Sequence, residues 1–276
     1  MKKIYLSLFI FILTTAIYAQ DLEKVKGNKV ITRQETQIDD FHTIIIDNDF
    51  KVGLIQGQTA SVDVETDENL HEYLDFNISK GVLTLSKTAK LSPKKSIVLK
   101  VSYSDNLTNI RVKDKAEAYS LTPIDLENIT LIVEGSAEAK LTLKADHFTF
   151  QSNEKTKTEL NITSKSATFT LSGNAKLDAH VYSDSTQIEQ YDRSKISFEG
   201  KTNELTVLAD NNAQFAGSKF LAQTCKTTNE ASGDTFLNVS GNVVIDAAGS
   251  SSVYLYNNPK ITIERFNDSA KIQKKE

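Results

Sequence analysis

The chain has 276 residues, a net charge of −4 from 32 basic and 36 acidic residues, one cysteine and no tryptophan. Both signs of charge are interspersed, so there is no basic stripe to neutralise phosphates, and nucleic acid is not an expected partner. A single cysteine excludes an intramolecular disulfide.

The first 19 residues have the pattern of a secretory signal peptide. Lys2 and Lys3 give a positive start, residues 4–13 are apolar, and the small Ala19 stands at a plausible cleavage point. The apolar stretch is shorter than the roughly 20 residues of a membrane span, which makes a retained anchor the weaker alternative. We therefore expect an exported mature chain without a transmembrane segment, in the periplasm or at the cell surface.

Strands are predicted along the rest of the N-terminal part. Residues 20–40 are polar and are interpreted as a linker or an edge strand. From Phe41 onward apolar and polar residues alternate, so residues 41–109 are predicted as a β-strand segment continuous with residues 110–276. Within it, residues 69–74 suit a short helical turn, and Ser79-Lys80-Gly81 suits a hairpin. This segment is expected to cap the remainder of the chain.

Residues 110–276 repeat about every 19 residues, regularly from Leu131 onward. The recurring apolar column is Leu131, Phe150, Phe169, Ile188, Val207, Cys225, Ile245 and Ile263. Six residues later comes a column of small residues: Ala137, Thr156, Ala175, Ser194, Ala213, Ala231, Ser251 and Ser269. Thr, Ser, Val, Ile and Asn dominate and no helical periodicity is sustained, so the repeat predicts an all-β parallel β-helix (β-solenoid).

Equivalent residues of such a solenoid stack from coil to coil, so Phe150 is expected on Leu131 and Phe169 on Phe150. Cys225 is interpreted as a core residue of this column and not as a nucleophile. The terminal coils expose strand edges. At the C-terminal end the lysines of residues 271–275 are expected to discourage edge pairing.

No catalytic, cofactor-binding or metal-ligating residue is predicted. A catalytic solenoid needs carboxylates on neighbouring coils, and aligning residues 169–225 stacks none. Instead Asp192 aligns with Gly173 and Asn211 at a bend. The other acids in this alignment are Asp178, Asp184 and Asp210. The four histidines, which lack ligand spacing, are His42, His71, His147 and His180.

The chain resembles the putative auto-transporter adhesins with a head GIN domain, a family of uncharacterised exported bacterial proteins. The resemblance rests on Phe41-His42-Thr43-Ile44-Ile45-Ile46, on Phe50-Lys51-Val52-Gly53-Leu54-Ile55-Gln56-Gly57 and on the Ser/Gly/Ala-rich repeats. It implies a right-handed solenoid and supplies no residue with an assigned role. The end of the signal, Tyr18-Ala19-Gln20, is similar to those of exported Bacteroidetes proteins.

Three functions are compatible with these features. The leading hypothesis is a non-enzymatic, adhesin-like protein of the cell envelope whose polar outer wall binds carbohydrate or an envelope protein. The first alternative is a carbohydrate-active enzyme, a polysaccharide lyase or hydrolase, on the same scaffold. The second is a structural periplasmic scaffold that forms homo-oligomers through solenoid ends or flat faces. A purely solubilising coat explains the polar wall equally well.

Overall fold

The computed structural model describes residues 23–94 and 97–276, so the predicted signal peptide lies outside the described residues. The N-terminal part contains the 3-10 helix η1 (Glu68–Tyr73) and the strands β1 (Lys24–Lys26), β2 (Ile31–Gln37), β3 (Thr43–Ile46), β4 (Lys51–Gln56), β5 (Ser61–Asp67), β6 (Leu74–Ser79), β7 (Val82–Lys87), β8 (Lys90–Ser92) and β9 (Val98–Tyr103). The strands of the C-terminal part are β10 (Asn109–Val112), β11 (Glu117–Ser120), β12 (Ile124–Val133), β13 (Glu138–Ser152), β14 (Lys157–Leu171), β15 (Lys176–Gln190), β16 (Lys195–Ala209), β17 (Gln214–Asn229), β18 (Asp234–Ala247), β19 (Ser252–Tyr256), β20 (Lys260–Phe266) and β21 (Lys271–Lys274).

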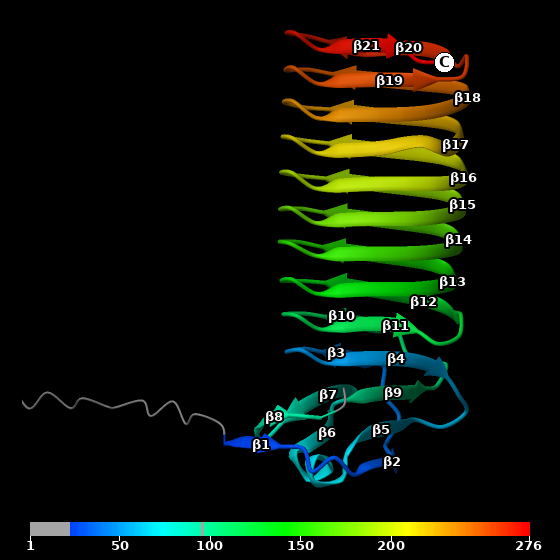
Figure 1. Cartoon of the computed structure of the whole chain (residues 1–276). Helices are drawn as coiled ribbons and strands as arrows, with labels where there is room; N and C mark the ends of the chain where they lie inside the picture. The colour runs from blue at the N-terminus through cyan, green and yellow to red at the C-terminus, as the bar shows by residue number, and fades with distance from the viewer. Residues whose placement is uncertain (1–22, 95–96) are drawn as a thin grey trace, which may run out of the picture.

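The long strands are the coils of a right-handed parallel β-solenoid, as predicted (Figure 1). Each coil from β13 to β17 is one strand that bends in its middle, giving a first leg and a second leg. In β14 these legs are residues 157–164 and 166–171, with Lys165 at the bend left out of the pairing. A tight turn joins each coil to the next, and successive coils pair in parallel.

Apolar side chains of both legs fill the inside of the stack. The predicted column is in register from Leu131 through Phe150, Phe169 and Ile188 to Val207. The ring centroid of Phe169 lies 6.2 Å from that of Phe150 and 4.8 Å from that of Phe198. Burying such rings removes much apolar area from water, which is the main stabilising contribution in a fold whose coils contact mainly their neighbours.

The predicted column is wrong at Cys225. Thr227 stands between Val207 and Ile245, whereas Cys225 stands between Leu205 and Val243 in the neighbouring inward column. The cause is coil length. One extra residue enters β17 after Ser197 pairs with Ala216, and the next coil is correspondingly shorter. Thr227 is tolerated inside because the Asn229 amide donates a hydrogen bond to it at 2.9 Å.

The predicted small column is also wrong at two places, because one extra residue enters β17 and another enters β20 after Ile263. Gly233 and Ala270 occupy the inward position instead. Asp234, which follows Gly233, pairs with Gln214, and Lys271, which follows Ala270, pairs with Ser252. Ala231 and Ser269 are exposed instead. Ala231 lies in the left-handed region with φ +59°. This conformation costs an L-residue roughly 1–2 kcal/mol.

The tight turns form an edge on which one residue of each coil has positive φ. Gly173 (φ +68°) is confined there, since a Cβ would lie 2.8 Å from the Glu154 backbone nitrogen. Asp192 (φ +60°) occupies the next turn, as predicted, and its carboxylate accepts a hydrogen bond from the Gly173 N–H at 2.9 Å. Asp268 accepts one from Gly249 at 3.0 Å in the same way. These carboxylates therefore tie neighbouring turns together.

The N-terminal end of the stack is covered by antiparallel strands (Figure 1). Strand β3 pairs with β10 on one side and with β7 on the other. Strand β4 pairs with β11 on one side and with β9 on the other. Strands β6, β5 and β2 then continue the sheets in antiparallel pairs. The predicted hairpin is present with φ +51° at Lys80 and +72° at Gly81, and η1 covers the predicted helical turn.

Two acidic side chains hold this end together. Asp67 is fully buried, and its carboxylate accepts hydrogen bonds from the backbone N–H groups of Lys29 at 2.6 Å and Lys94 at 2.8 Å. Asp63 binds the Arg33 guanidinium through two hydrogen bonds of 2.7 and 2.6 Å. Paired bonds of this kind fix the position of β2 against β5.

Candidate functional site

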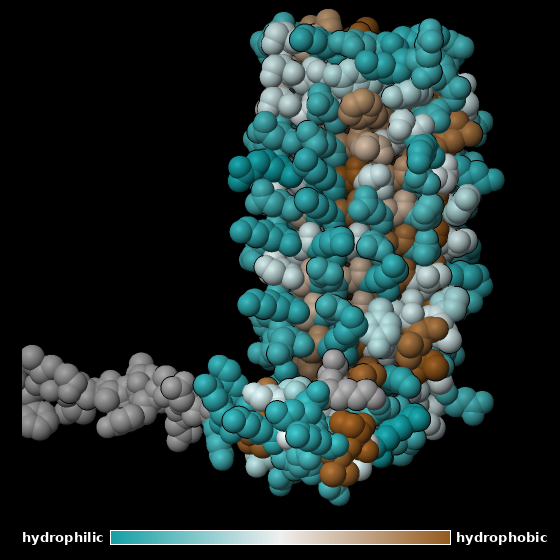
Figure 2. Space-filling model, in the orientation of Figure 1, coloured by the Kyte–Doolittle hydropathy of each residue, from teal (hydrophilic) through white to brown (hydrophobic). Residues whose placement is uncertain are grey.

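Two neighbouring outward columns of the first legs form a surface, here called the first-leg face, and a further outward column, Asn161, His180 and Glu199, borders it. The first column, in register order, is Lys51, Glu117, Glu138, Lys157, Lys176 and Lys195. The second is Gly53, Tyr119, Lys140, Glu159, Asp178 and Ser197. Parallel pairing spaces neighbours in a column by about 4.8 Å. Figure 2 shows hydrophilic side chains in rows along the stack, with apolar atoms visible between them.

Opposite charges pair across this face. Lys51 lies 2.6 Å from Glu117, Lys140 lies 2.9 Å from Glu159, and Lys157 lies 3.9 Å from Glu159. The hydrogen bond from Lys140 lowers the pKa of Glu159, and the bond to Glu117 raises the pKa of Lys51. Both groups are therefore firmly charged at neutral pH. Exposed pairs of this kind contribute little to stability.

Two shallow hollows lie side by side on the face and share Lys140 and Glu159. The first has a volume of about 310 Å³ and contains Tyr119 and Glu138. The second has a volume of about 360 Å³ and contains Asp178 in addition to the shared pair. The two hollows adjoin at Lys140 and Glu159, and together they extend across the coils from β4 to β16. An extended ligand would fit this shape better than a compact one.

Tyr119 is the aromatic residue of the first hollow. Its ring packs over Gly53, where a Cβ would approach the ring to 3.0 Å. Lys51 places its Nζ 5.9 Å from the ring centroid. Because Gly53 carries no side chain, the half-buried Tyr119 ring packs directly on β4 and gives the first hollow an aromatic platform.

The second hollow contains His180 and Glu199. Lys219 lies 2.8 Å from the Glu199 carboxylate, and His180 lies 3.7 Å from it. The hydrogen bond from Lys219 lowers the pKa of Glu199. His180 thus projects outward, in agreement with the alternation of inward and outward residues along its coil.

Two pairs of carboxylates on neighbouring coils were missed by the sequence alignment, which extended only over residues 169–225. Glu117 is paired in register with Glu138, and Glu159 with Asp178. The spacing of 159 and 178 matches the repeat, so a longer alignment would have found that pair. Within residues 23–94 and 97–276, the side-chain carboxylates of Glu138 and Asp178 make no hydrogen bond or ion pair, so their oxygens are available to a ligand.

The remaining residues singled out in the sequence do not gather into a site. Asp178 aligns with Ser197, and the Asn203 amide donates a hydrogen bond to Asp184 at 3.2 Å, as the alignment predicted. Asp210 accepts a bond of 2.6 Å from the Asn211 N–H within its turn. Burial raises the pKa of the Cys225 thiol to about 12, so it is not an activated nucleophile.

Three histidines lie outside the hollows. His42 contacts Thr43 at 2.9 Å, His71 contacts Thr32 at 3.0 Å and His147 contacts Ser166 at 2.8 Å. Over the described part of the chain no three His, Cys, Asp or Glu residues are grouped to hold a metal ion. The same residues include no helix with the length and apolar character needed to cross a membrane.

Comparison with known proteins identifies the family. The family model described as "putative auto-transporter adhesin, head GIN domain" matches residues 40–183 and 153–259. The chain belongs to this family. Both matches fall on the repeat and its N-terminal extension, in agreement with the resemblance noted from the sequence. A search of curated proteins gave no match.

Solved structures of similar fold come from Parabacteroides species. A putative adhesin from Parabacteroides merdae is similar with a TM-score of 0.68 at 15% identity, over 92% of this chain and 100% of that one. A putative adhesin from Parabacteroides distasonis has a TM-score of 0.62 at 18% identity, over 91% and 100%. A putative lipid binding protein from Parabacteroides distasonis has a TM-score of 0.62 at 15% identity, over 92% and 100%. At these identities the likeness concerns the fold.

Proposed function

We propose that this head GIN domain protein is an exported, non-enzymatic, adhesin-like protein that binds an extended carbohydrate along its first-leg face. The observation that carries the proposal is the row of two adjoining hollows on this face. It combines one stacking ring, Tyr119, with the charged pair Lys140 and Glu159 and the uncommitted carboxylate of Asp178. Sugar rings bind proteins through the same combination of stacking and hydrogen bonds to hydroxyl groups.

The rigidity of the scaffold supports this function. Every outward side chain of the face is held by a strand with a paired neighbour on both sides. A preorganised surface loses little conformational freedom on binding, so many weak polar contacts can add up to useful affinity. Export to the periplasm or the cell surface is part of the proposal and is supported by the adhesin family and the N-terminal signal pattern.

A glycan array followed by calorimetry with the best ligand tests the proposal. Tyr119→Ala, and the double variant Lys140→Ala with Glu159→Ala, are each expected to weaken binding by roughly tenfold or more. The double variant removes both partners of the closer ion pair, and of the charges on this face only Lys157 loses a partner, at 3.9 Å. Thr149→Ala and Thr168→Ala, which alter an outward column of the second legs, are the matched controls and should leave binding unchanged. Equal binding by all variants would rule the face out.

The register pairing of Glu159 with Asp178 favours a second candidate, hydrolysis or lytic cleavage of a polysaccharide at the same hollows. Two carboxylates roughly 5–10 Å apart are the usual requirement for glycoside hydrolysis. Against it, Lys140 holds the pKa of Glu159 low, which suits a permanent ion pair better than a proton donor. The test is whether the protein releases new sugar ends from a polysaccharide. If it does, and if Glu159→Gln and Asp178→Asn each abolish this release, the protein is an enzyme and the non-enzymatic proposal is refuted.

A further inference from the structure

The C-terminal end of the stack exposes residues that belong to the core columns. Ile261, Ile263 and Phe266 of β20 are 47%, 52% and 49% exposed. Their register partners in β18 are Val243, Ile245 and Ala247, all fully buried. In the described part of the chain, β20 pairs with β18 on one side and with no strand on the other. The edge of β20 therefore offers both apolar side chains and unpaired backbone groups.

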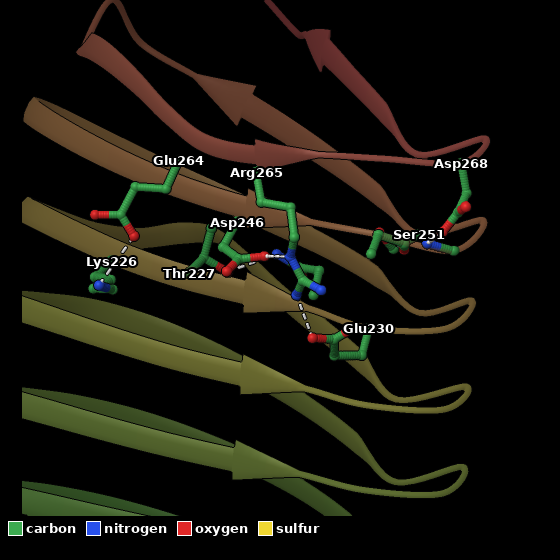
Figure 3. Close-up of polar contacts among 11 residues, drawn as sticks. Lys226, Thr227, Glu230, Asp246, Ser251, Glu264, Arg265 and Asp268 are labelled. Atoms are coloured by element: carbon green, nitrogen blue, oxygen red, sulfur yellow. Dashed lines mark hydrogen bonds and ion pairs between the residues drawn. The ribbon is translucent and has the colours of Figure 1, made fainter.

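This edge is a fixed strand because side chains tie it to the coils beneath (Figure 3). The Arg265 guanidinium binds the carboxylates of both Glu230 and Asp246. Glu264 accepts a hydrogen bond from Lys226, two coils away, at 3.2 Å. A strand held in this way has already lost its conformational freedom, so pairing with a second strand costs little further ordering.

The sequence of this edge is complementary to itself in the antiparallel direction. Placing a two-fold axis at Thr262 sets Lys260 of one strand opposite Glu264 of the other, and Ile261 opposite Ile263, each twice. Opposite charges and apolar residues facing each other across antiparallel strands stabilise the pair. We propose that a second copy of this chain pairs with residues 260–264 through this two-fold axis, forming an end-to-end dimer.

Such a dimer closes at two copies. The outermost strand at the other end, β2, reads Ile31-Thr32-Arg33-Gln34-Glu35-Thr36-Gln37 and is polar along nearly its whole length. Charged residues on an edge strand oppose pairing. Strand β21, which pairs with β19 and is the other outermost strand at the C-terminal end, carries Lys271 and Lys274. Because the contact joins the same surface of both copies, no further copy can add.

Sedimentation equilibrium of the full chain tests the proposal. The chain should be a dimer, and Ile263→Lys should raise the dissociation constant by roughly tenfold or more, since it puts a charge into the apolar contact. Lys260→Glu should weaken the dimer, and adding Glu264→Lys should restore it by rebuilding the charge pairs in reverse. Circular dichroism of each variant separates loss of the dimer from loss of the fold.

Cross-linking supplies an independent measurement. Thr262→Cys should give a covalent dimer on oxidation, because the two residues 262 face each other and Cys225 is buried. Thr168→Cys, in the same outward column but in an interior coil, should not. The proposal is overturned by a chain that stays monomeric at all concentrations. It is equally overturned by a dimer that survives Ile263→Lys and does not cross-link through position 262.

Discussion

The two ends of the solenoid solve the same problem in different ways. At the N-terminal end, parallel coils give way to antiparallel strands, and the last of these, β2, presents polar residues held by Arg33 and Asp63. At the C-terminal end, the coil after β18 consists of two separate strands, β19 and β20, and β21 pairs on top of β19. Three core residues of β20 face solvent. One end is finished within the chain, whereas the other has the properties of an interface.

The difference shows that capping depends on a change of strand direction. A further parallel coil pairs with the exposed strand edge of the stack, but it exposes an equivalent unpaired edge on its own outer side. An antiparallel pair such as β2 and β5 can place a polar strand outermost. The cap should therefore unfold when its internal polar contacts are lost, and the C-terminal coil should respond only locally.

Asp67→Ala is expected to have the largest effect. It leaves the N–H groups of Lys29 and Lys94 without their charged acceptor in a buried place, which should cost about 3 kcal/mol of unfolding free energy. Urea denaturation measures the loss, and hydrogen exchange should locate it in β1, β2 and β5. Asp75→Ala, at an exposed position of β6, is the matched control and should change stability little. Unaltered exchange in the cap would contradict the role given to Asp67.

Arg265→Ala should have a smaller and strictly local effect. It removes contacts to Glu230 and Asp246 that are partly exposed, so only a small loss of unfolding free energy is expected. Amide exchange should rise in β20 and leave the coils β13–β16 unchanged. Lys226→Ala breaks one exposed ion pair, with Glu264, and should raise amide exchange in β20 less than Arg265→Ala does. Faster exchange spreading into β15 would show that the end is not locally held.

Ala231→Gly should stabilise the protein by about 1 kcal/mol. The N-terminal turns place Asn48 and Asp114 in the left-handed region, whereas the turn before β18 places Ala231 there. Glycine removes the clash that alanine suffers in this conformation. A rise in the thermal midpoint measures the gain. Ala213→Gly, at the buried inward position of the previous turn, should lower it.

The sequence was sufficient to predict the solenoid, because one face of every strand is buried by its neighbours and the apolar period follows directly. The predicted columns are wrong where the number of residues in a coil changes. Cys225 and Ala231 were misplaced because β17 gained a residue and the next coil was shorter. Ser269 was misplaced because an extra residue enters β20 after Ile263 pairs with Ile245. A fixed period cannot register a bulge that only the backbone pairing defines.

The candidate site was harder to predict than the fold. The pairing of Lys140 with Glu159 follows from in-register stacking, but the apolar pattern says nothing of which outward residues matter. The platform of Tyr119 depends on Gly53, 66 positions earlier, and they meet only because β4 pairs with β11. Contacts between segments so distant in sequence are fixed by topology, which local patterns do not contain.

The coils from β13 to β16 pair with an unbroken offset of 19 residues. Deleting or duplicating one such block would leave every remaining residue facing the same way, with its turn still on the same edge. The height of the molecule can therefore change in steps of about 4.8 Å, the separation of paired strands. Evolution and protein engineering can thus adjust how far one end is held from the other without redesigning either.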